Sequence, residues 1–278
     1  MPVRKKIRTL LVSSLLLLTG VPSGQLLALE TEESPEAASG KNRQAVVFSR
    51  KYPDLTVKKA YNLQKAYVRN RVSKGVRISG YKAGLTGKGA PQNLGLSDPI
   101  SGVLLADPLT GDGVALQLRD ANHIIVEQEL AFRFSRDIRK EISLEELRES
   151  VDAVAPAIEL PDASFPDGEF NGLDIIANNA MGWKFIIGSW QPVPKKIDNI
   201  PVVLSCNGSV LAQGKSSHVK GGQWELLHWM VNHLLQHGYN IHAGQLILTG
   251  NLLRPVDAAA CDYSADFGKL GKINFRME

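Results

Sequence analysis

Apolar and polar residues alternate along several short segments of this chain, at the two-residue spacing of a half-buried strand. The segment 123–135, HIIVEQELAFRFS, alternates and then becomes mostly apolar, so it predicts a strand that enters a core. The segment 77–89, RISGYKAGLTGKG, predicts a strand that runs into a glycine-rich loop. Shorter strands are expected at 102–105, 114–118, 183–190, 201–206, 245–250 and 271–276.

Two apolar runs are separated by Asn207 and Gly208 in the stretch VVLSCNGSVLAQ. Both residues tolerate positive φ angles, which a two-residue hairpin turn requires. The stretch therefore predicts a β-hairpin. Asn207 also begins a glycosylation sequon, and we prefer the turn as the explanation of this residue.

An apolar period of about 3.6 residues predicts two longer helices. The first covers 54–74 and is expected to end at Gly75. The second covers 223–237 and is amphipathic. Its apolar face consists of Leu227, Met230, Val231, Leu234 and Leu235.

A third helix is predicted after Ser143, because Glu146 stands three residues later and completes a capping box. Pro156 is expected to end this helix, and a strand that carries Glu159 is expected to follow. Most predicted elements are strands, without regular strand–helix alternation and without an internal repeat. The pattern therefore predicts an α+β fold with a mixed sheet core.

Residues 1–28 are typical of a secretory signal peptide. Basic residues at 4–8 precede an apolar run at 10–18 that is too short to span a bilayer comfortably. Ala28 offers a small residue for cleavage. The alternative is an uncleaved membrane anchor.

The chain after the signal segment divides into two parts. Residues 29–45 are polar and poor in large apolar residues, and they predict a flexible linker. Residues 46–278 have well-distributed apolar content and are numerous enough to form one large domain. A periplasmic or secreted protein is expected, with no stable membrane insertion after signal cleavage.

The charge balance argues against a nucleic-acid-binding surface. The whole chain carries 32 basic and 28 acidic residues, a formal net charge of +4. Because residues 1–28 hold four basic residues and no acidic one, the remainder has 28 of each and is formally neutral. The basic excess therefore belongs to the signal segment.

Cys206 and Cys261 are the two cysteines of the chain. An oxidising compartment would allow a disulfide between them, but the sequence does not show whether they meet. Their spacing matches no zinc motif.

Several common catalytic motifs are absent. The glycine-rich GLTGKG is not a standard phosphate-binding loop, and the chain has no serine-hydrolase elbow. His233 and His237 are four residues apart in the helix predicted at 223–237, but no HExxH pattern surrounds them. They are interpreted as part of a solvated helix face.

A set of three glutamates is the best indication of chemistry. Glu127 and Glu129 are two residues apart on a predicted strand, so their side chains point to the same face. Such pairs are usually the wet face of a strand, but the residues that follow Glu129 are apolar, and buried carboxylates need a cation or hydrogen-bond donors. Glu159 from a neighbouring strand completes an all-oxygen site that suits Mg²⁺ or Mn²⁺.

Lys82 is the second candidate. It lies between Tyr81 and Ala83 at the end of a predicted strand. In a cleft, burial would lower the pKa of this lysine, and nearby glutamates would raise it. An ordinary surface lysine is the alternative interpretation.

Six segments occur in an order that resembles a known family. They are GYKAGLT at 80–86, VEQELAF at 126–132, DAVAPAIELPD at 152–162, DIIANNA at 174–180, AGQLILTGNLLRP at 243–255 and DYSADFGKLGKINF at 262–275. Together they resemble the 2-keto-4-pentenoate hydratase and 2-oxo-3-hexenedioate decarboxylase group of the fumarylacetoacetate hydrolase superfamily. The resemblance covers roughly residues 54–278.

The resemblance implies a mixed β-sandwich-like roll with a small helical N-terminal part, in a homo-oligomer. It implies Mg²⁺ or Mn²⁺ held by Glu127, Glu129 and Glu159, and a small 2-oxo acid or 2-hydroxy-dienoate that chelates the metal. It assigns to Lys82 a role in proton transfer or in holding the substrate carboxylate. Lys82, Leu130 and Asn179 are the substrate-binding residues expected on this basis.

The chain departs from the family pattern at two places. Where the group usually has Pro-Asp-x-Gly, this chain has Ile100 in place of the acidic residue, and Asp98 lies two residues earlier. Where the group often has Ala-Asp-Asn-Ala-Ser, residues 177–181 read Ala-Asn-Asn-Ala-Met. The first change removes a candidate general base, and the second removes a charge and a hydroxyl.

The leading hypothesis is a metal-dependent lyase of the hydratase or decarboxylase type, such as a 2-keto-4-pentenoate hydratase. Two alternatives belong to other classes. One is an exported protein that binds metal and 2-oxo acids without catalysis. The other is an acylpyruvate-type hydrolase of carbon–carbon bonds.

Overall fold

The computed structural model describes residues 44–105, 107–111, 113–166 and 170–278. The predicted signal segment at 1–28 and nearly all of the linker at 29–45 lie outside the described residues. Both assignments stay predictions. The described residues contain no helix that is long and apolar enough to cross a membrane.

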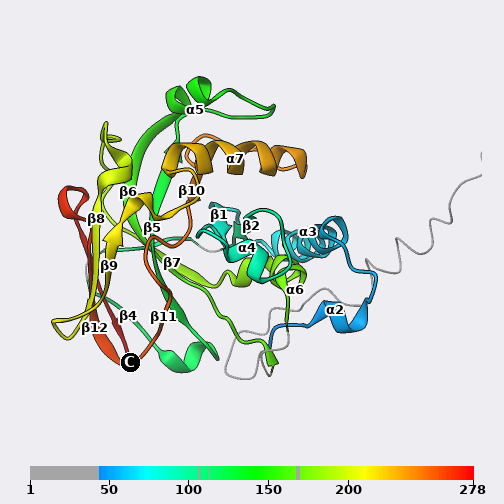
Figure 1. Ribbon diagram of the computed structural model, residues 1–278, viewed down its shortest axis with the longest axis horizontal. Coiled ribbons are helices and arrows are strands. Elements are labelled where there is room, and N and C mark those ends of the chain that lie inside the picture. The colour runs from blue at the N-terminus through cyan, green and yellow to red at the C-terminus, as the bar shows by residue number, and fades with distance from the viewer. Residues whose placement is uncertain (1–43, 106, 112, 167–169) are drawn as a thin grey trace, which may run out of the picture. The chain divides into compact units, whose positions relative to one another are not determined.

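Two sheets form the framework of the described residues (Figure 1). The larger sheet has the order β2-β1-β10-β5-β6-β7-β3, and β11 pairs with β5 outside this path. Its strands are β1 (Gly80–Gly84), β2 (Ile100–Leu104), β3 (Leu109–Thr110), β5 (Ile125–Phe134), β6 (Val151–Leu160), β7 (Lys184–Ile187), β10 (Leu246–Leu248) and β11 (Val256–Asp257).

The smaller sheet has the order β4-β13-β12-β8-β9. Its strands are β4 (Val114–Leu116), β8 (Pro201–Cys206), β9 (Ser209–Lys215), β12 (Cys261–Asp266) and β13 (Lys272–Met277). The pairs β1–β10, β3–β7 and β4–β13 are parallel and the others are antiparallel, so both sheets are mixed. The predicted α+β class with a mixed sheet core is confirmed.

The helices are few and mostly short. They are α2 (Phe48–Lys51), α3 (Val57–Ser73), α4 (Ala90–Asn93), α5 (Leu144–Ser150), α6 (Gly172–Ala177) and α7 (Gln223–Gln236). Single 3-10 turns are η1 (Leu118–Asp120), η3 (Asn179–Met181), η4 (Ile197–Asn199), η5 (Ser216–His218) and η6 (Gly268–Leu270). Figure 1 shows α2, α3 and α6 together on one side of the sheets. Helices α2 and α3 are the expected small helical N-terminal part, and α6 comes from the middle of the chain.

Strand β5 is buried on both faces. Its even-numbered side chains, such as Leu130 and Phe132, lie in the main core with side chains of the smaller sheet and of α7. Its odd-numbered Ala131 lies in a separate cluster with Ala155 and Ala157 of β6. The sequence prediction that this strand enters a core is therefore confirmed, and the face of Glu127 and Glu129 is an interior face.

The hairpin prediction is confirmed by the backbone. Asn207 and Gly208 have φ angles of 47° and 81°, and they connect β8 to β9. Positive φ at both central residues is the geometry that an Asn-Gly turn favours. Helices α3 and α7 are also confirmed to within a few residues of their predicted ends.

The prediction that Pro156 ends a helix is wrong. Helix α5 ends at Ser150, and Pro156 lies inside strand β6, opposite Leu130 of β5. The Pro156 carbonyl accepts from the Gly188 N–H at 2.9 Å, so the backbone nitrogen of this residue also faces the β7 side. Strand β7 ends at Ile187, and the missing N–H therefore removes no bond from the β5–β6 ladder.

The prediction of a solvated polar face on α7 is also wrong. His228 Nε2 lies 2.7 Å from the Ile142 carbonyl, and Asn232 pairs with the backbone of the same residue. His233 Nε2 lies 2.9 Å from the Tyr61 hydroxyl. Burial lowers the pKa of His233 to about 4, so this imidazole is neutral at pH 7. The polar side chains of α7 join it to neighbouring segments.

Side chains satisfy the free edge of β2. The Tyr61 hydroxyl of α3 accepts from Ser101 N–H at 3.0 Å. The Gln64 side chain donates to the Ser101 carbonyl at 2.8 Å and to the Ile176 carbonyl of α6 at 3.1 Å. An edge strand otherwise leaves its outward N–H and C=O groups unpaired. These bonds attach α3 to strand β2 and to α6.

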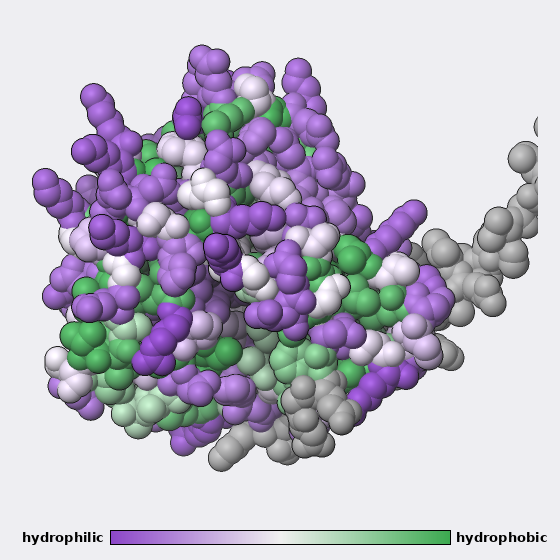
Figure 2. Space-filling view, in the orientation of Figure 1, coloured by the Kyte–Doolittle hydropathy of each residue, from purple (hydrophilic) through white to green (hydrophobic). Residues whose placement is uncertain are grey.

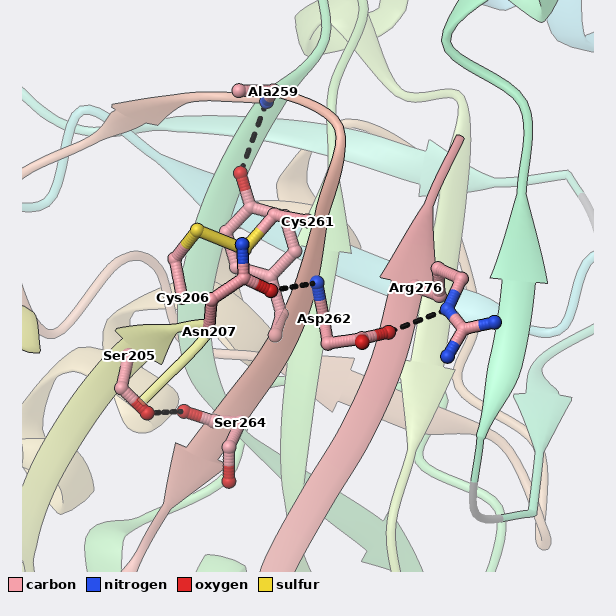
Figure 3. Close-up of a disulfide and its surroundings, with 9 residues drawn as sticks. Ser205, Cys206, Asn207, Ala259, Cys261, Asp262, Ser264 and Arg276 are labelled. Atoms are coloured by element: carbon pink, nitrogen blue, oxygen red, sulfur yellow. Dashed lines mark hydrogen bonds and ion pairs between the residues drawn. A yellow bond between two sulfur atoms is a disulfide. The ribbon is translucent and has the colours of Figure 1, made fainter. Parts of the chain in front are cut away.

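Cys206 and Cys261 form a disulfide, with their Cα atoms 5.8 Å apart (Figure 3). It joins the end of β8 to the start of β12 within the smaller sheet. The Asn207 side chain accepts from the Asp262 N–H at 3.1 Å beside it, so the turn and the disulfide close the same end of the sheet. The question that the sequence left open is answered by the fold.

The disulfide links residues that are 55 positions apart. Replacing both cysteines (Cys206→Ser with Cys261→Ser) is expected to lower the free energy of unfolding by roughly 2–4 kcal/mol, because the unfolded chain gains freedom. Thermal unfolding measures the effect as a fall in Tm. A reductant should reproduce this fall in the wild type and change nothing further in the double variant. A wild type whose Tm is insensitive to reductant would contradict the prediction.

Candidate metal centre

The three predicted glutamates come together at the β5–β6 pair. Glu127 and Glu159 are direct cross-strand partners, and Glu129 lies two residues along β5 on the same face. One carboxylate oxygen from each residue lies within 4.8 Å of the other two. The expectation that these side chains share one face is confirmed, and their role as metal ligands stays a prediction.

These carboxylates have few protein donors. Glu129 and Glu159 are 0% and 1% exposed, and Glu127 is half-buried. Gly250 N–H donates to Glu129 Oε2 at 2.7 Å. Glu129 Oε1 and Glu159 Oε2 are buried and have no hydrogen-bond partner among the described residues. Buried oxygens of this kind need a cation or a proton, so the donor set fits a hard divalent ion.

The pKa values of two of the glutamates also indicate that the cluster needs a cation or protons. Burial and then the neighbouring Glu159 raise the pKa of Glu127 to about 7, while Lys82 opposes the shift. Burial, then Glu159 and Glu127, raise the pKa of Glu129 well above its usual range. Without a cation the cluster therefore holds protons at neutral pH.

Lys82 lies at the same cluster and is not a surface lysine. It is 3% exposed, and its ammonium donates to Glu159 Oε1 and, at 2.8 Å, to the Ala180 carbonyl. Burial lowers the pKa of Lys82, but the charges of the three glutamates outweigh it and raise the pKa overall. Lys82 is therefore a buried cation beside the carboxylates.

The other two predicted residues lie differently. The Leu130 side chain is fully buried in the main core, on the sheet face opposite to Glu129. The Asn179 side chain is 2% exposed and bonds to both backbone groups of Val103. The structure therefore does not bring the Leu130 side chain to the carboxylates. The expected substrate contacts of both residues stay predictions.

The sequence reasoning missed two backbone groups at the site. The Ala180 carbonyl holds Lys82, and the Gly250 N–H holds Glu129. Gly250 has a φ of 85°, and a Cβ at this position would lie 2.2 Å from the Thr86 hydroxyl. A glycine at the end of the predicted strand 245–250 was the available signal for a close approach. The role of the Ala180 carbonyl has no signal in the sequence, because every residue has a backbone carbonyl.

The family's missing acidic residue is not replaced from nearby. Ile100 lies on the same sheet face as Lys82, opposite Gly84, and packs in an apolar cluster with Ile176 and Ala180. Asp98 is exposed and lies 3.5 Å from the Lys220 ammonium. An isoleucine thus takes the interior position where the resemblance implies a carboxylate.

The chain belongs to the fumarylacetoacetate hydrolase family, since the model of the fumarylacetoacetate (FAA) hydrolase C-terminal domain matches residues 80–274. A 4-oxalocrotonate decarboxylase from a Pseudomonas species is 29% identical over 80% of this chain and 87% of its own length. A 2-hydroxyhexa-2,4-dienoate hydratase from Comamonas testosteroni is 32% identical over 76% of this chain and 82% of its own length.

A solved structure is similar over nearly the whole chain. The 4-oxalocrotonate decarboxylase from Pseudomonas putida G7, complexed with magnesium and adipate, superposes with a TM-score of 0.84. It is 25% identical and the match covers 93% of this chain and 99% of that one. The same enzyme complexed with calcium and acetate has a TM-score of 0.82. The fold implied by the sequence resemblance is confirmed.

Replacing Glu129 tests the ligand assignment. Glu129→Gln is expected to weaken Mn²⁺ binding at least about 100-fold, because it removes one anionic ligand. It should also leave the Tm of the metal-free protein at or above the wild-type value, because the amide replaces a buried carboxyl group whose charged form is disfavoured by burial and by Glu159 and Glu127. Calorimetry and thermal unfolding measure the two effects. Glu225→Gln, an exposed glutamate on α7, is the matched control. Unchanged Mn²⁺ affinity in Glu129→Gln would disprove the assignment.

The stability of the metal-free protein should depend on pH in a defined direction. The pKa of Glu127 is about 7 in the folded chain against an ordinary value of 4.5. Between these values the folded state binds more protons than the unfolded state, so stability falls as pH rises from about 4.5 to about 7. Divalent cations displace these protons, and the Mg²⁺-induced rise in Tm should grow over the same range.

Thermal unfolding from pH 5 to pH 8, with Mg²⁺ and with chelator, checks this dependence. Glu127→Gln should flatten the metal-free profile. A Mg²⁺ effect of constant size across the range would show that the cluster does not exchange protons for the cation.

Proposed function

We propose that this protein is a metal-dependent lyase of the hydratase or decarboxylase type, acting on a small 2-oxo acid or 2-hydroxy-dienoate such as 2-keto-4-pentenoate. The observation that carries the proposal is the buried cluster of Glu127, Glu129 and Glu159 with Lys82 against it. Relatives named as hydratases and decarboxylases of such compounds support the substrate class.

The carboxylates of Glu127, Glu129 and Glu159 would hold Mg²⁺ or Mn²⁺. When bound, the cation would supply positive charge that stabilises negative charge developing on the substrate C2 oxygen. The carboxylate oxygens of Glu129 and Glu159 that lack donors are the groups available for it. Ala131, Ala155 and Ala157 line the same sheet face with small apolar side chains, which keep water from the carboxylates on that side.

Lys82 would supply the second positive charge of the site. Three carboxylates exceed the charge of one divalent cation by one unit, and an anionic substrate increases the excess. An ammonium has three N–H donors, and Glu159 and the Ala180 carbonyl occupy two of them. The third N–H is suited to the substrate carboxylate or to proton delivery to the dienol carbon.

A second candidate function is binding of metal and 2-oxo acid without turnover. Ile100 favours it, because this interior side chain cannot accept a proton where the resemblance implies an acidic residue. The two candidates share the metal centre and differ in product formation. Binding of the ligand with no product would support the second.

We also infer that the protein is exported and assembles as a homo-oligomer. The signal-like segment at 1–28 and the Cys206–Cys261 disulfide support export to a periplasmic or extracellular compartment. The family resemblance supports assembly. N-terminal sequencing of the mature protein after cell fractionation tests the first inference, and light scattering tests the second.

The lyase assignment is tested by following the ultraviolet absorbance of 2-hydroxypenta-2,4-dienoate with Mg²⁺ and then with chelator. Metal-dependent loss of the dienol with 4-hydroxy-2-oxopentanoate as product is expected. Lys82→Met should lower kcat/KM by about 10²–10⁴-fold, because proton transfer and charge balance are lost. Lys184→Met, a partly buried strand lysine, should leave it nearly unchanged. Wild-type protein that binds Mn²⁺ but converts neither a dienol nor a 2-oxo acid would refute the assignment.

A further inference from the structure

We propose that Asn179 is a positioning residue, which fixes the ammonium of Lys82 by holding the left-handed turn Asn179–Met181 against strand β2. This inference refines the proposed function, since it concerns the same site. It assigns to Asn179 a role other than the substrate contact expected from the sequence.

The Asn179 side chain pairs with β2 as a neighbouring strand would. Its Oδ1 accepts from the Val103 N–H and its Nδ2 donates to the Val103 carbonyl, both at 2.8 Å. Among the described residues β2 pairs with β1 alone, so these groups face an open sheet edge. One amide thus replaces the missing strand at this position.

The turn that Asn179 begins has an unfavourable backbone. Asn179, Ala180 and Met181 have φ angles of 54°, 50° and 60°. Residues with a Cβ rarely adopt this region, and three in succession persist only where surrounding contacts hold them. Such backbone strain is concentrated at functional sites, so the strain in this turn points to a functional role.

The turn packs tightly on both β2 and Lys82. A Cβ at Gly102 of β2 would lie 3.0 Å from the Asn179 carbonyl, from Ala180 Cβ and from Lys82 Cγ. The absence of a side chain at Gly102 therefore lets the turn, the strand and the lysine stem meet at one point. A small displacement of the turn would move the group that Lys82 contacts.

The turn directs the Ala180 carbonyl toward the ammonium of Lys82. Ala180 O accepts from Lys82 Nζ at 2.8 Å, and Glu159 accepts from the same ammonium. A lysine stem has four rotatable bonds, and two fixed acceptors restrict its end to one place. The Asn179 amide acts on Lys82 only through this carbonyl, which makes it a positioning residue.

The same geometry argues against a substrate contact from the Asn179 side chain. Both polar atoms of its amide already have backbone partners, and the residue is 2% exposed. Binding of substrate would require the amide to leave Val103 and expose a buried strand edge.

Asn179→Gly removes the amide without adding backbone strain at this position. Glycine adopts a φ of 54° without penalty, so Asn179→Gly removes the hold on Val103 and relaxes the turn. Gln64→Ala is the matched control. It removes a buried amide that bonds to the Ser101 carbonyl of β2, two residues away, and to the Ile176 carbonyl of α6. It leaves both bonds between Asn179 and Val103 in place.

The first readout is independent of turnover. Native protein is exposed briefly to acetic anhydride, and acetylation of Lys82 is quantified by mass spectrometry. Asn179→Gly is expected to increase the acetylation rate of Lys82 at least about 10-fold, because the ammonium loses its fixed acceptor and opens to solvent more often. Gln64→Ala should change it less than about threefold. Equal rates in wild type and Asn179→Gly, or equal increases in both variants, would overturn the proposal.

The second readout is kinetic, with 2-hydroxypenta-2,4-dienoate as substrate. Asn179→Gly should lower kcat about 10–100-fold with KM and the Mn²⁺ dissociation constant within about threefold of wild type. A raised KM with kcat unchanged would instead assign Asn179 to substrate binding and overturn the proposal. If the wild type does not turn over, the proposed function fails, while the acetylation rates still decide the role of Asn179.

Discussion

The structure of this protein depends on burying three carboxylates within 4.8 Å of one another on one sheet face. Like charges at this distance in a protein interior repel, and desolvation adds to the cost. The raised pKa values of Glu127 and Glu129 are the direct result. The fold must supply enough stability elsewhere to keep this arrangement, and Lys82 is the single buried cation placed against it among the described residues.

One face of strands β5 and β6 packs in the main core, and the other face carries the glutamates. Even-numbered β5 residues such as Leu130 and Phe132 pack into the main core, where both sheets and α7 contribute apolar side chains. The opposite face carries the glutamates and the small cluster around Ala131 and Ala157. Because alternation in a strand is strict, the large core on one face fixes the register that brings Glu127 opposite Glu159. The face of the molecule shown in Figure 2 is mainly hydrophilic, and its apolar residues form separate groups.

Side chains of helix α3 and of the turn after α6 bond to the edge strand β2. Tyr61 and Gln64 of α3 satisfy the outward backbone groups of β2, and Asn179 does the same two residues farther along. These bonds hold α6 and the turn after it against β2, and the Ala180 carbonyl of this turn accepts from Lys82 of β1. Family membership and the similarity to a decarboxylase complexed with magnesium agree with a metal-binding role of the carboxylate cluster. Ile100 marks where this chain differs, because its apolar side chain packs with α6 instead of offering a proton acceptor.

Much of the architecture was predictable from local patterns. The alternation in 123–135, the Asn207-Gly208 turn and the Ser143 capping box each depend on a few adjacent residues, and each appears in the structure. The predicted end of the Ser143-capped helix at Pro156 is wrong, because α5 ends at Ser150 and strand β6 accommodates a proline whose nitrogen faces the end of β7. A local sequence pattern does not show where the neighbouring strand β7 ends, and therefore does not show whether the Pro156 nitrogen would lack a hydrogen-bond partner.

The sequence by itself determined that Glu127 and Glu129 point to one face of their strand, because residues at i and i+2 share a face in any strand. Tertiary structure alone decided how these residues are held. The Ala180 carbonyl, the Gly250 N–H and the partners of His233 come from segments far apart in the chain. Backbone groups are the same at every residue, so their use depends on the relative placement of elements. The Cys206–Cys261 bond was decided in the same way, because the packing of β8 beside β12 brings the two cysteines within reach.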